Sequence, residues 1–334
     1  MRQTRVQPAP GPLLPDSDGA DLVPLGASAG GSTAYVSAWT PRFSGVAAVD
    51  LRTGALHPVR RFADPAADQA DGTSDGRWLV WAQTYSQASL DTFTIYAYDA
   101  RTGRVRSIGH SLADPDGTAW PSPWHAPAVG GGYAAWAQGY AAGGLVEIRL
   151  ADLATGTVET IARGHVQQPF FDGRLVVWPE SDAPGAQTTL RAYSVASRLR
   201  AAVPPVLAAV HGTDQIVTDG RRTAYLSPDF TRLYYSADQD TAATVAVRLP
   251  AGADFTDLAL APGALAWTTS SATYLASTTT GAFEQVTPAF GYPTGSASVM
   301  LITDAPRQQA PHPVQATYVV DPAAAAARLM ACSR

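Results

Sequence analysis

The stretches SDGRWLVWAQ (74–83), VGGGYAAWAQ (129–138) and FDGRLVVWPE (171–180) share one pattern of a turn followed by an apolar run that ends near a Trp. A second pattern, centred on an Asp-x-x-Thr-Gly turn, recurs in VAAVDLRTGALHPV (46–59), IYAYDARTGRVRSI (95–108) and IRLADLATGTVETI (148–161). The two patterns alternate with a period of about 45 residues, the length of a β-propeller blade made of short strands. The repeat therefore predicts a β-propeller.

We predict an all-β protein with a single seven-bladed propeller of four-stranded antiparallel blades over residues 23–330; six or eight blades are the alternatives. A Pro-rich tether precedes it at 1–22 and a short tail follows at 331–334. The alanine run at 323–327 can form a helix in place of a last strand, because alanine is the best helix former. The expected blades are 23–62, 66–111, 120–163, 165–206, 210–249, 253–287 and 292–330.

Composition excludes several classes of site. The 334 residues include no Lys and no Asn, which indicates a GC-rich, bacterial genome and excludes a Schiff-base lysine, a P-loop lysine and an N-glycan acceptor. Cys332 is the only cysteine, so neither an intrachain disulfide nor a cysteine zinc site can form. The net charge of −5 gives no reason to expect nucleic acid as a partner.

Localisation and assembly follow from weaker signals. No apolar run is long enough to span a membrane, and the Pro-rich start favours a secreted or surface-tethered protein whose signal or anchor lies outside this sequence. We expect a monomer without a cofactor, and no insertion of this chain into a membrane.

The segments SPDF (227–230), TSDGRWLVW (73–81) and YDARTG (98–103) resemble the TolB-type, WD40-like β-propeller repeat. The usual phrase of that repeat is Ser-Pro-Asp-Gly before an apolar strand and Asp-x-x-Thr-Gly after a later one. The resemblance covers most of the chain and implies the propeller fold. It implies no single function, because the repeat serves binding, scaffolding and several enzymes. No catalytic motif of the family matches, so no catalytic residue is carried over.

The four tryptophans of the repeat have a fixed place at the end of the second strand of a blade. We expect them to pack between neighbouring blades, as large side chains at such positions do in propellers. They are Trp81, Trp136, Trp178 and Trp267.

Any ligand site is expected on the face that carries the long, variable loops over the second to fourth blades. Gln83, Gln138 and Glu180 each stand two residues after a repeat Trp. They form either a hydrogen-bonding wall, with Glu180 as its ionisable member, or strand ends that satisfy loop backbone. Surplus aromatic side chains suit a sugar ring or a peptide side chain, or else a small loop core: Tyr85, Trp120, Trp124 and Tyr140.

Three histidines precede the first turn of successive blades by similar distances. His125, His165 and His211 would make a three-imidazole metal site if they met at the channel mouth. Their offsets differ, however, and an odd shift along a strand turns a side chain to the opposite face. Solvated loop histidines are the expected outcome, and no metal is favoured.

These observations favour a non-catalytic module that binds a protein or glycan on its loop face. The alternative is an enzyme on the same face: a metal-assisted lyase or hydrolase with Glu180 as acid/base, or a glycosidase. A glycosidase needs a second carboxylate in the cleft, such as Asp214 or Asp257. A purely structural spacer is the third hypothesis.

Overall fold

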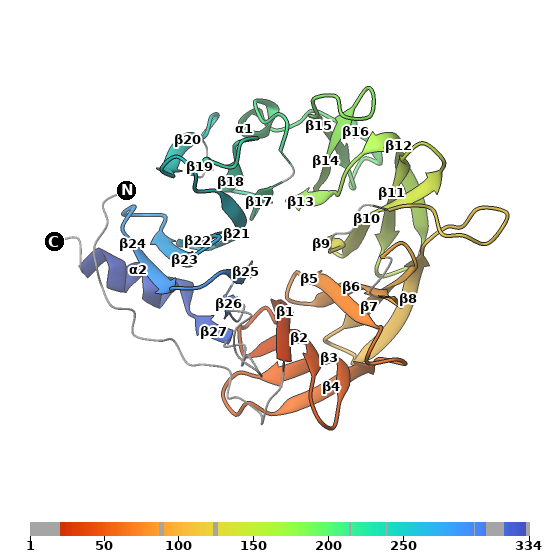
Figure 1. The fold of residues 1–334 in the computed structure, drawn as a ribbon, viewed down its shortest axis with the longest axis horizontal. Helices are drawn as coiled ribbons and strands as arrows, with labels where there is room; N and C mark the ends of the chain where they lie inside the picture. Colours follow the sequence, from red (N-terminus) through yellow and green to blue (C-terminus); the bar gives the residue numbers. More distant parts are fainter. Residues whose placement is uncertain are drawn as a thin grey trace.

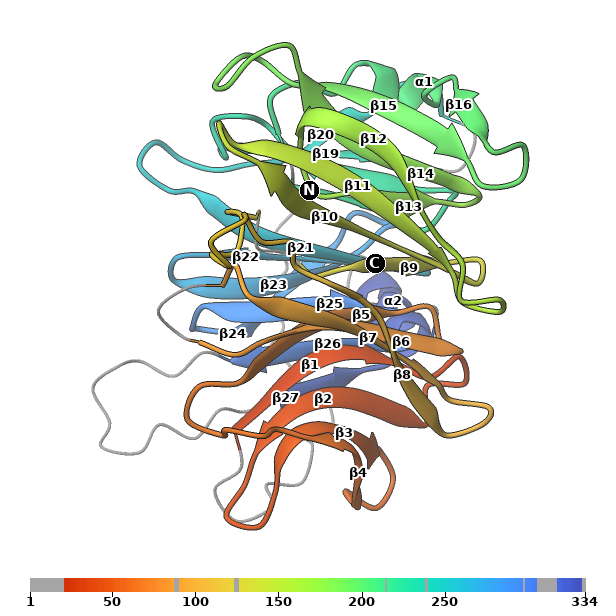
Figure 2. The same ribbon diagram turned by 90° about the vertical axis from the view of Figure 1, so that its right-hand side faces the viewer.

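The computed structural model describes residues 21–86, 90–122, 126–213, 215–237, 240–296, 298–304 and 317–331. Antiparallel sheets surround a central axis, with their first strands innermost (Figure 1). Seen from its edge, the protein is a thick disc whose strands run between the two faces (Figure 2). The predicted all-β propeller fold is therefore confirmed.

The first two sheets have four strands each, in sequence order from the axis outward. They contain β1 (Asp21–Ala27), β2 (Thr33–Trp39), β3 (Ser44–Asp50), β4 (Leu56–Arg61), β5 (Gln69–Ser74), β6 (Trp78–Thr84), β7 (Phe93–Asp99) and β8 (Arg104–His110).

The next eight strands form one sheet, because the end of β12 pairs with β14. This sheet contains β9 (Ala128–Gly130), β10 (Tyr133–Ala141), β11 (Leu145–Asp152), β12 (Val158–Val166), β13 (Phe170–Asp172), β14 (Leu175–Ser181), β15 (Thr189–Ser194) and β16 (Leu199–Ala201). Since two expected blades share backbone hydrogen bonds here, the count of seven blades stays a prediction.

The remaining sheets have four, four and three strands. After helix α1 (Pro205–Ala208) come β17 (Ile216–Thr218), β18 (Thr223–Leu226), β19 (Arg232–Ser236), β20 (Thr244–Arg248), β21 (Phe255–Ala261), β22 (Ala264–Thr269), β23 (Ala272–Ser277), β24 (Phe283–Thr287), β25 (Gly291–Gly295), β26 (Met300–Asp304), β27 (Thr317–Val320) and helix α2 (Pro322–Ala331). Helix α2 stands where a fourth strand of the last sheet was one expectation, and the helical alternative is confirmed. Its Arg328 pairs with the buried Glu284 of β24.

The Asp-x-x-Thr-Gly turns are held by local interactions. Asp50 Oδ1 accepts hydrogen bonds from the backbone N–H groups of Arg52 and Thr53, at 3.0 and 2.7 Å. Gly54 then adopts φ of 73°, a conformation that side chains with a Cβ rarely adopt. Asp99 and Gly103 repeat the arrangement in the second sheet, with φ of 70° at the glycine. The turn sequence thereby closes the outer hairpin of the first two sheets.

The core lies between neighbouring sheets rather than inside them. Trp81 packs in one cluster with Leu25 and Tyr35 of the first sheet, and Trp136 packs with Trp78 of the second. The four repeat tryptophans are between 0 and 2% exposed, which confirms their predicted place between blades: Trp81, Trp136, Trp178 and Trp267.

The first sheet (β1–β4) and the last (β25–β27) meet where the ring closes. Leu301 of β26 and Val299 beside it pack into the apolar cluster of the first sheet, and Ser298 Oγ donates to the carbonyl of Ser28 at 3.3 Å. No backbone ladder joins the two sheets in the described ranges. Among the described residues, side-chain packing and this hydrogen bond therefore hold the junction.

Residues 1–20, 305–316 and 332–334 fall outside the described ranges, so the predicted tether and tail stay predictions. Neither α1 nor α2, in the described part of the chain, has the length and hydropathy needed to cross a bilayer.

Candidate functional site

The innermost strands enclose an axial channel with a cavity of about 590 Å³. The strands β5 and β21 lie on opposite sides of this channel (Figure 1) and contribute Asp71 and Asp257 to its wall. Polar neighbours on the wall are Thr73, Thr256, Gln215 and Thr218, and apolar ones include Phe170 and Phe171. The cavity has the volume of a ligand site, and its wall combines apolar side chains with several polar groups.

Local backbone geometry presents the two carboxyl groups. Asp71 lies opposite Ala82 in the β5–β6 ladder, and the glycine that follows it, Gly72, is packed so closely on Trp81 that a Cβ would clash. In β21 the register shifts between Phe255 and Asp257, a bulge that turns the strand locally. Asp257 Oδ1 accepts the N–H of Leu258 at 2.8 Å.

Both carboxyl groups are harder to ionise than usual. Burial raises the pKa of Asp71 to about 6, against a smaller opposing effect of a backbone hydrogen bond from Gly72. Burial, together with a smaller effect of the negative charge of Asp71, raises the pKa of Asp257 to about 7 against the hydrogen bond from Leu258. Carboxyl groups that line a cavity, interact electrostatically and have strongly shifted pKa values are a common feature of functional sites. Near neutral pH such a pair accepts hydrogen bonds, attracts a cation, or supplies one acid and one base.

The predicted row Gln83, Gln138 and Glu180 is divided among separate networks. Gln83, 1% exposed, accepts a hydrogen bond from Arg60 Nε at 3.1 Å and donates to Asp68 at 3.0 Å. Glu180 accepts the indole N–H of Trp178 at 3.0 Å and lies 3.9 Å from a guanidinium nitrogen of Arg200.

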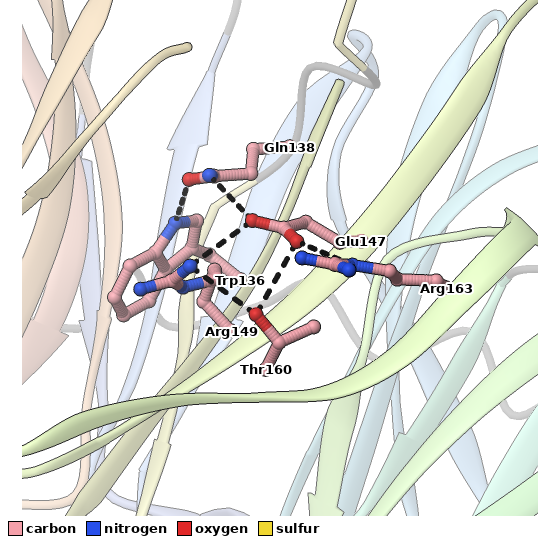
Figure 3. A network of polar contacts seen from close by, with 6 residues as sticks. All are labelled: Trp136, Gln138, Glu147, Arg149, Thr160 and Arg163. Carbon is pink, nitrogen blue, oxygen red and sulfur yellow. Dashed lines mark hydrogen bonds and ion pairs between the residues drawn. The ribbon is translucent and has the colours of Figure 1, made fainter. Parts of the chain in front are cut away.

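Gln138 belongs to the network drawn in Figure 3, which surrounds Glu147 of β11. Gln138 accepts the indole N–H of Trp136 at 2.8 Å and donates to Glu147 at 3.0 Å. Each residue of the predicted row thus has a partner inside the protein, and the role of the row in ligand binding stays a prediction.

Glu147 is 1% exposed and fully satisfied by its neighbours. One oxygen accepts from Gln138 and Arg149, and the other accepts from Thr160 and Arg163, at 3.0–3.2 Å. Burial alone would raise the pKa of Glu147, but the hydrogen bonds from Arg163 and Arg149 hold it below its ordinary value. A buried carboxylate whose lone pairs are all occupied has a structural role.

We expect Glu147→Gln to lower the free energy of unfolding by about 1.5–3 kcal/mol, because hydrogen bonds from two guanidinium groups to a charged acceptor weaken. Glu159→Gln is the matched control, since Glu159 pairs with Arg198 at 3.3 Å but is 34% exposed. Urea denaturation monitored by tryptophan fluorescence measures both. Equal stability of the two variants would contradict the structural role of Glu147.

Three of the four predicted aromatic residues lie in the described ranges, and each has different neighbours. Tyr85, 37% exposed, hydrogen-bonds through its hydroxyl to Thr94 and Tyr96. The Tyr140 ring lies 5.2 Å from the guanidinium carbon of Arg163. Trp120 belongs to the loop that rests on Gly139, where an added Cβ would meet its side chain. Trp124 lies outside the described residues.

The histidines do not meet in the described structure. His165 pairs across the ladder with Ser181, and His211 bridges to Thr189. No cluster of three potential metal ligands occurs among the described residues, and both His125 and the suggested glycosidase partner Asp214 lie outside them. The other suggested partner, Asp257, faces the channel with Asp71, whereas Glu180 is held by Trp178 and Arg200.

Asp71 is a candidate that the sequence reasoning missed. It lies in an acidic segment, 63–76, that lacks the spacing of a calcium loop. The signal that could have identified Asp71 is its place inside the innermost strand of a blade, where most of the neighbouring residues in the sequence are apolar or small.

No family model matches this chain, and no curated protein matches its sequence. Solved structures share its fold at low identity. An oligogalacturonate lyase in complex with manganese has a TM-score of 0.61 and 11% identity, over 91% of this chain and 90% of that one. An oligogalacturonate lyase from Vibrio parahaemolyticus has a TM-score of 0.58 and 10% identity, over 94% and 98%.

A prolyl endopeptidase also matches, with a TM-score of 0.59 and 14% identity over 92% of this chain. This chain spans about half of its length, 47%. At these identities the likeness shows the fold alone. The predicted β-propeller fold is confirmed at that level, and the solved structures that share it include enzymes.

Proposed function

We propose that this protein is a non-catalytic β-propeller binding module whose axial channel receives a cationic group of a protein ligand. The observation that carries the proposal is the pair of carboxyl groups, Asp71 and Asp257, that face one cavity of about 590 Å³ from opposite strands. A lysine or arginine side chain, or an amino terminus, relieves the charge repulsion between them. The proposed site therefore lies inside the axial channel, whereas the sequence had predicted a site on the loop face.

The charge of the channel disfavours an anionic glycan. Oligogalacturonate, the ligand class named for two proteins of similar fold, carries a carboxylate on each sugar. Bringing such a chain beside Asp71 and Asp257 costs electrostatic free energy unless both are protonated. A cationic or neutral ligand meets no such cost.

Catalysis is the second candidate function. Burial raises the pKa values of Asp71 and Asp257 to about 6 and about 7, so that near neutral pH one group can be protonated while the other is ionised. Two carboxyl groups with separated roles are the usual machinery of general acid–base chemistry. The similar fold of a lyase and of a peptidase supports catalysis as the second candidate function.

A peptide array tests the binding proposal. The probes are extended peptides with one Lys or Arg, the same peptides with Gln at that position, and a parallel set of neutral and uronate-bearing glycans. We expect the parent to prefer the cationic peptides, and Asp71→Asn/Asp257→Asn to bind them about tenfold more weakly or worse, because charge-assisted hydrogen bonds are lost.

Two controls make the array decisive. Asp254→Asn removes an exposed carboxyl group close to β21 and should bind like the parent. Trp124→Ala tests the loop face, and a loss of binding there with normal binding by the double aspartate variant would overturn the channel site. Release of a new reducing end or amine from an array ligand, abolished in Asp257→Asn, would instead establish the enzyme.

We also propose an extracytoplasmic location, on the basis of the Pro-rich segment before the first strand. Fractionation of cells that express the natural gene tests it, and recovery of the protein with cytoplasmic markers would contradict it.

A further inference from the structure

A second cavity, of about 310 Å³, lies on the face of the disc that carries the short turns. It opens between the second sheet and the turn that joins β11 to β12. Its wall combines Arg77 and Trp78 at the start of β6, the turn from Asp99 to Arg104, Arg106 of β8, and Leu153 with Ala154 from the neighbouring turn. This cavity is separate from the axial channel.

Positive charge dominates this pocket. Four arginines and one carboxyl group line it, in a chain whose net charge is −5: Arg77, Arg101, Arg104, Arg106 and Asp99.

The carboxyl group is already occupied. Asp99 accepts the backbone N–H of Arg101 at 3.0 Å and lies 3.7 Å from Arg77 Nε, and these contacts help hold its pKa below the ordinary value against the effect of burial. Two further carboxylates stand near the rim, and both are engaged with their own turns: Asp75 and Asp152.

Two of the arginines are held in place over an indole. The guanidinium carbons of Arg77 and Arg106 lie 5.2 and 5.7 Å from the ring centre of Trp78, which is 6% exposed. Arg106 also donates to the carbonyl of Leu153, while its Nε is buried and has no partner within the described residues. Such fixed guanidinium groups lose little freedom when they bind an anion.

The other two arginines are exposed and available. Arg101 and Arg104 form no side-chain hydrogen bond or ion pair with any residue that the structure describes. Two arginines stacked on Trp78 and two arginines without side-chain partners thus line one cavity. An oxyanion placed there can accept hydrogen bonds from several N–H groups at once.

The repeat shows that the turn itself does not need these arginines. The turn of the second sheet carries Arg101, Arg104 and Arg106. The aligned positions are Arg52, Ala55 and His57 in the first sheet, and Ala154, Thr157 and Glu159 in the third pattern copy. All three copies keep the Asp and the Thr-Gly that build the turn. The additional arginines therefore call for an explanation other than folding.

We propose that this pocket binds a multivalent oxyanion, the phosphate or sulfate group of a ligand. Arginine matches such groups because its planar fork of N–H donors pairs with two oxygens at a time. Trp78 is covered by two guanidinium groups, so a sugar ring or base has no free aromatic face to stack on. Recognition here depends on charge and hydrogen bonds.

Isothermal titration calorimetry of the full chain tests this site with pyrophosphate, inorganic phosphate, inorganic sulfate and citrate as probes. We expect the phosphate or sulfate probes to bind the parent, with an affinity that falls as NaCl is raised. Arg101→Ser/Arg104→Ser should bind about tenfold more weakly or worse, since two charge-assisted contacts are removed. A preference for pyrophosphate assigns a phosphorylated ligand, and a preference for sulfate assigns a sulfated one.

Arg52→Ser is the matched control, because Arg52 occupies the position of Arg101 in the first sheet and its backbone makes the same contact to Asp50. It should bind the probes like the parent. Equal binding by the parent and the Arg101→Ser/Arg104→Ser variant would overturn the proposal, as would an equal loss in Arg52→Ser or a preference for citrate. Circular dichroism of each variant shows that the fold is retained. Failure of this site leaves the channel proposal unaffected, since the two cavities share no residue.

Discussion

Trp178→Ala lowers the free energy of unfolding by about 3–5 kcal/mol, as truncation of a fully buried aromatic side chain does. Trp178 is 0% exposed and packs with Ile148 and Val176 in the cluster that joins β10–β12 to β14 and β15. Its loss leaves a cavity between the two halves of the eight-stranded sheet and also deprives Glu180 of the indole donor at 3.0 Å. Both effects act in the same direction.

Urea denaturation at pH 7 measures this change. Leu199→Ala is the control, because Leu199 is an apolar residue of β16 in the same sheet but is 66% exposed. It should alter stability by less than about 0.5 kcal/mol. A Trp178→Ala variant that unfolds at the same urea concentration as the parent would show that the tryptophan is not a core residue.

The contribution of Asp71 and Asp257 to the stability of the protein falls as the pH rises from about 4 to about 8. Burial raises the pKa values of Asp71 and Asp257 from 3.8 to about 6 and about 7, so the folded protein binds more protons than the unfolded chain across this interval. The contribution of the pair then decreases with pH, because the group that must ionise does so less readily when folded. Well below pH 4 both states are protonated, and above about pH 8 the penalty is constant.

Asp71→Asn/Asp257→Asn removes this penalty. At pH 8 we expect the double variant to be more stable than the parent by at least about 3 kcal/mol, since each pKa unit corresponds to about 1.4 kcal/mol. At pH 4 the two proteins should be nearly equally stable. Asp254→Asn, which replaces an exposed carboxyl group close to β21, should keep the pH dependence of the parent. A stability difference between the double variant and the parent that stays constant from pH 4 to pH 8 would contradict the raised pKa values of the pair.

The sheets could be predicted from the sequence because their signals are local. Asp50 with Gly54, and Asp99 with Gly103, build the same turn from contacts within four residues. The repeat tryptophans were predictable for a similar reason: a fixed position in each pattern copy implies a fixed environment. The turn sequence and the repeated tryptophan position can both be recognised from short stretches of sequence.

The candidate site could not be predicted in the same way. Asp71 and Asp257 are nearly 190 positions apart, and only closure of the ring brings β5 and β21 to opposite walls of one channel. The row Gln83, Gln138 and Glu180 was visible in the sequence, but its partners were not. Arg60 reaches Gln83 from another sheet, and Glu147 reaches Gln138 from the adjacent strand.

The junctions between sheets differ in how they resist separation. Backbone pairs connect β12 to β14, so the two halves of the eight-stranded sheet, β9–β12 and β13–β16, should exchange their amide hydrogens together, as one cooperative unit. The junction of the first and last sheets has neither a connecting loop nor a backbone ladder in the described ranges; it depends on Val299, Leu301 and one hydroxyl contact. Thermal fluctuations should therefore open the disc there first, widening the axial channel from the side without unfolding a single sheet. Such transient opening offers an extended peptide a lateral entry to Asp71 and Asp257.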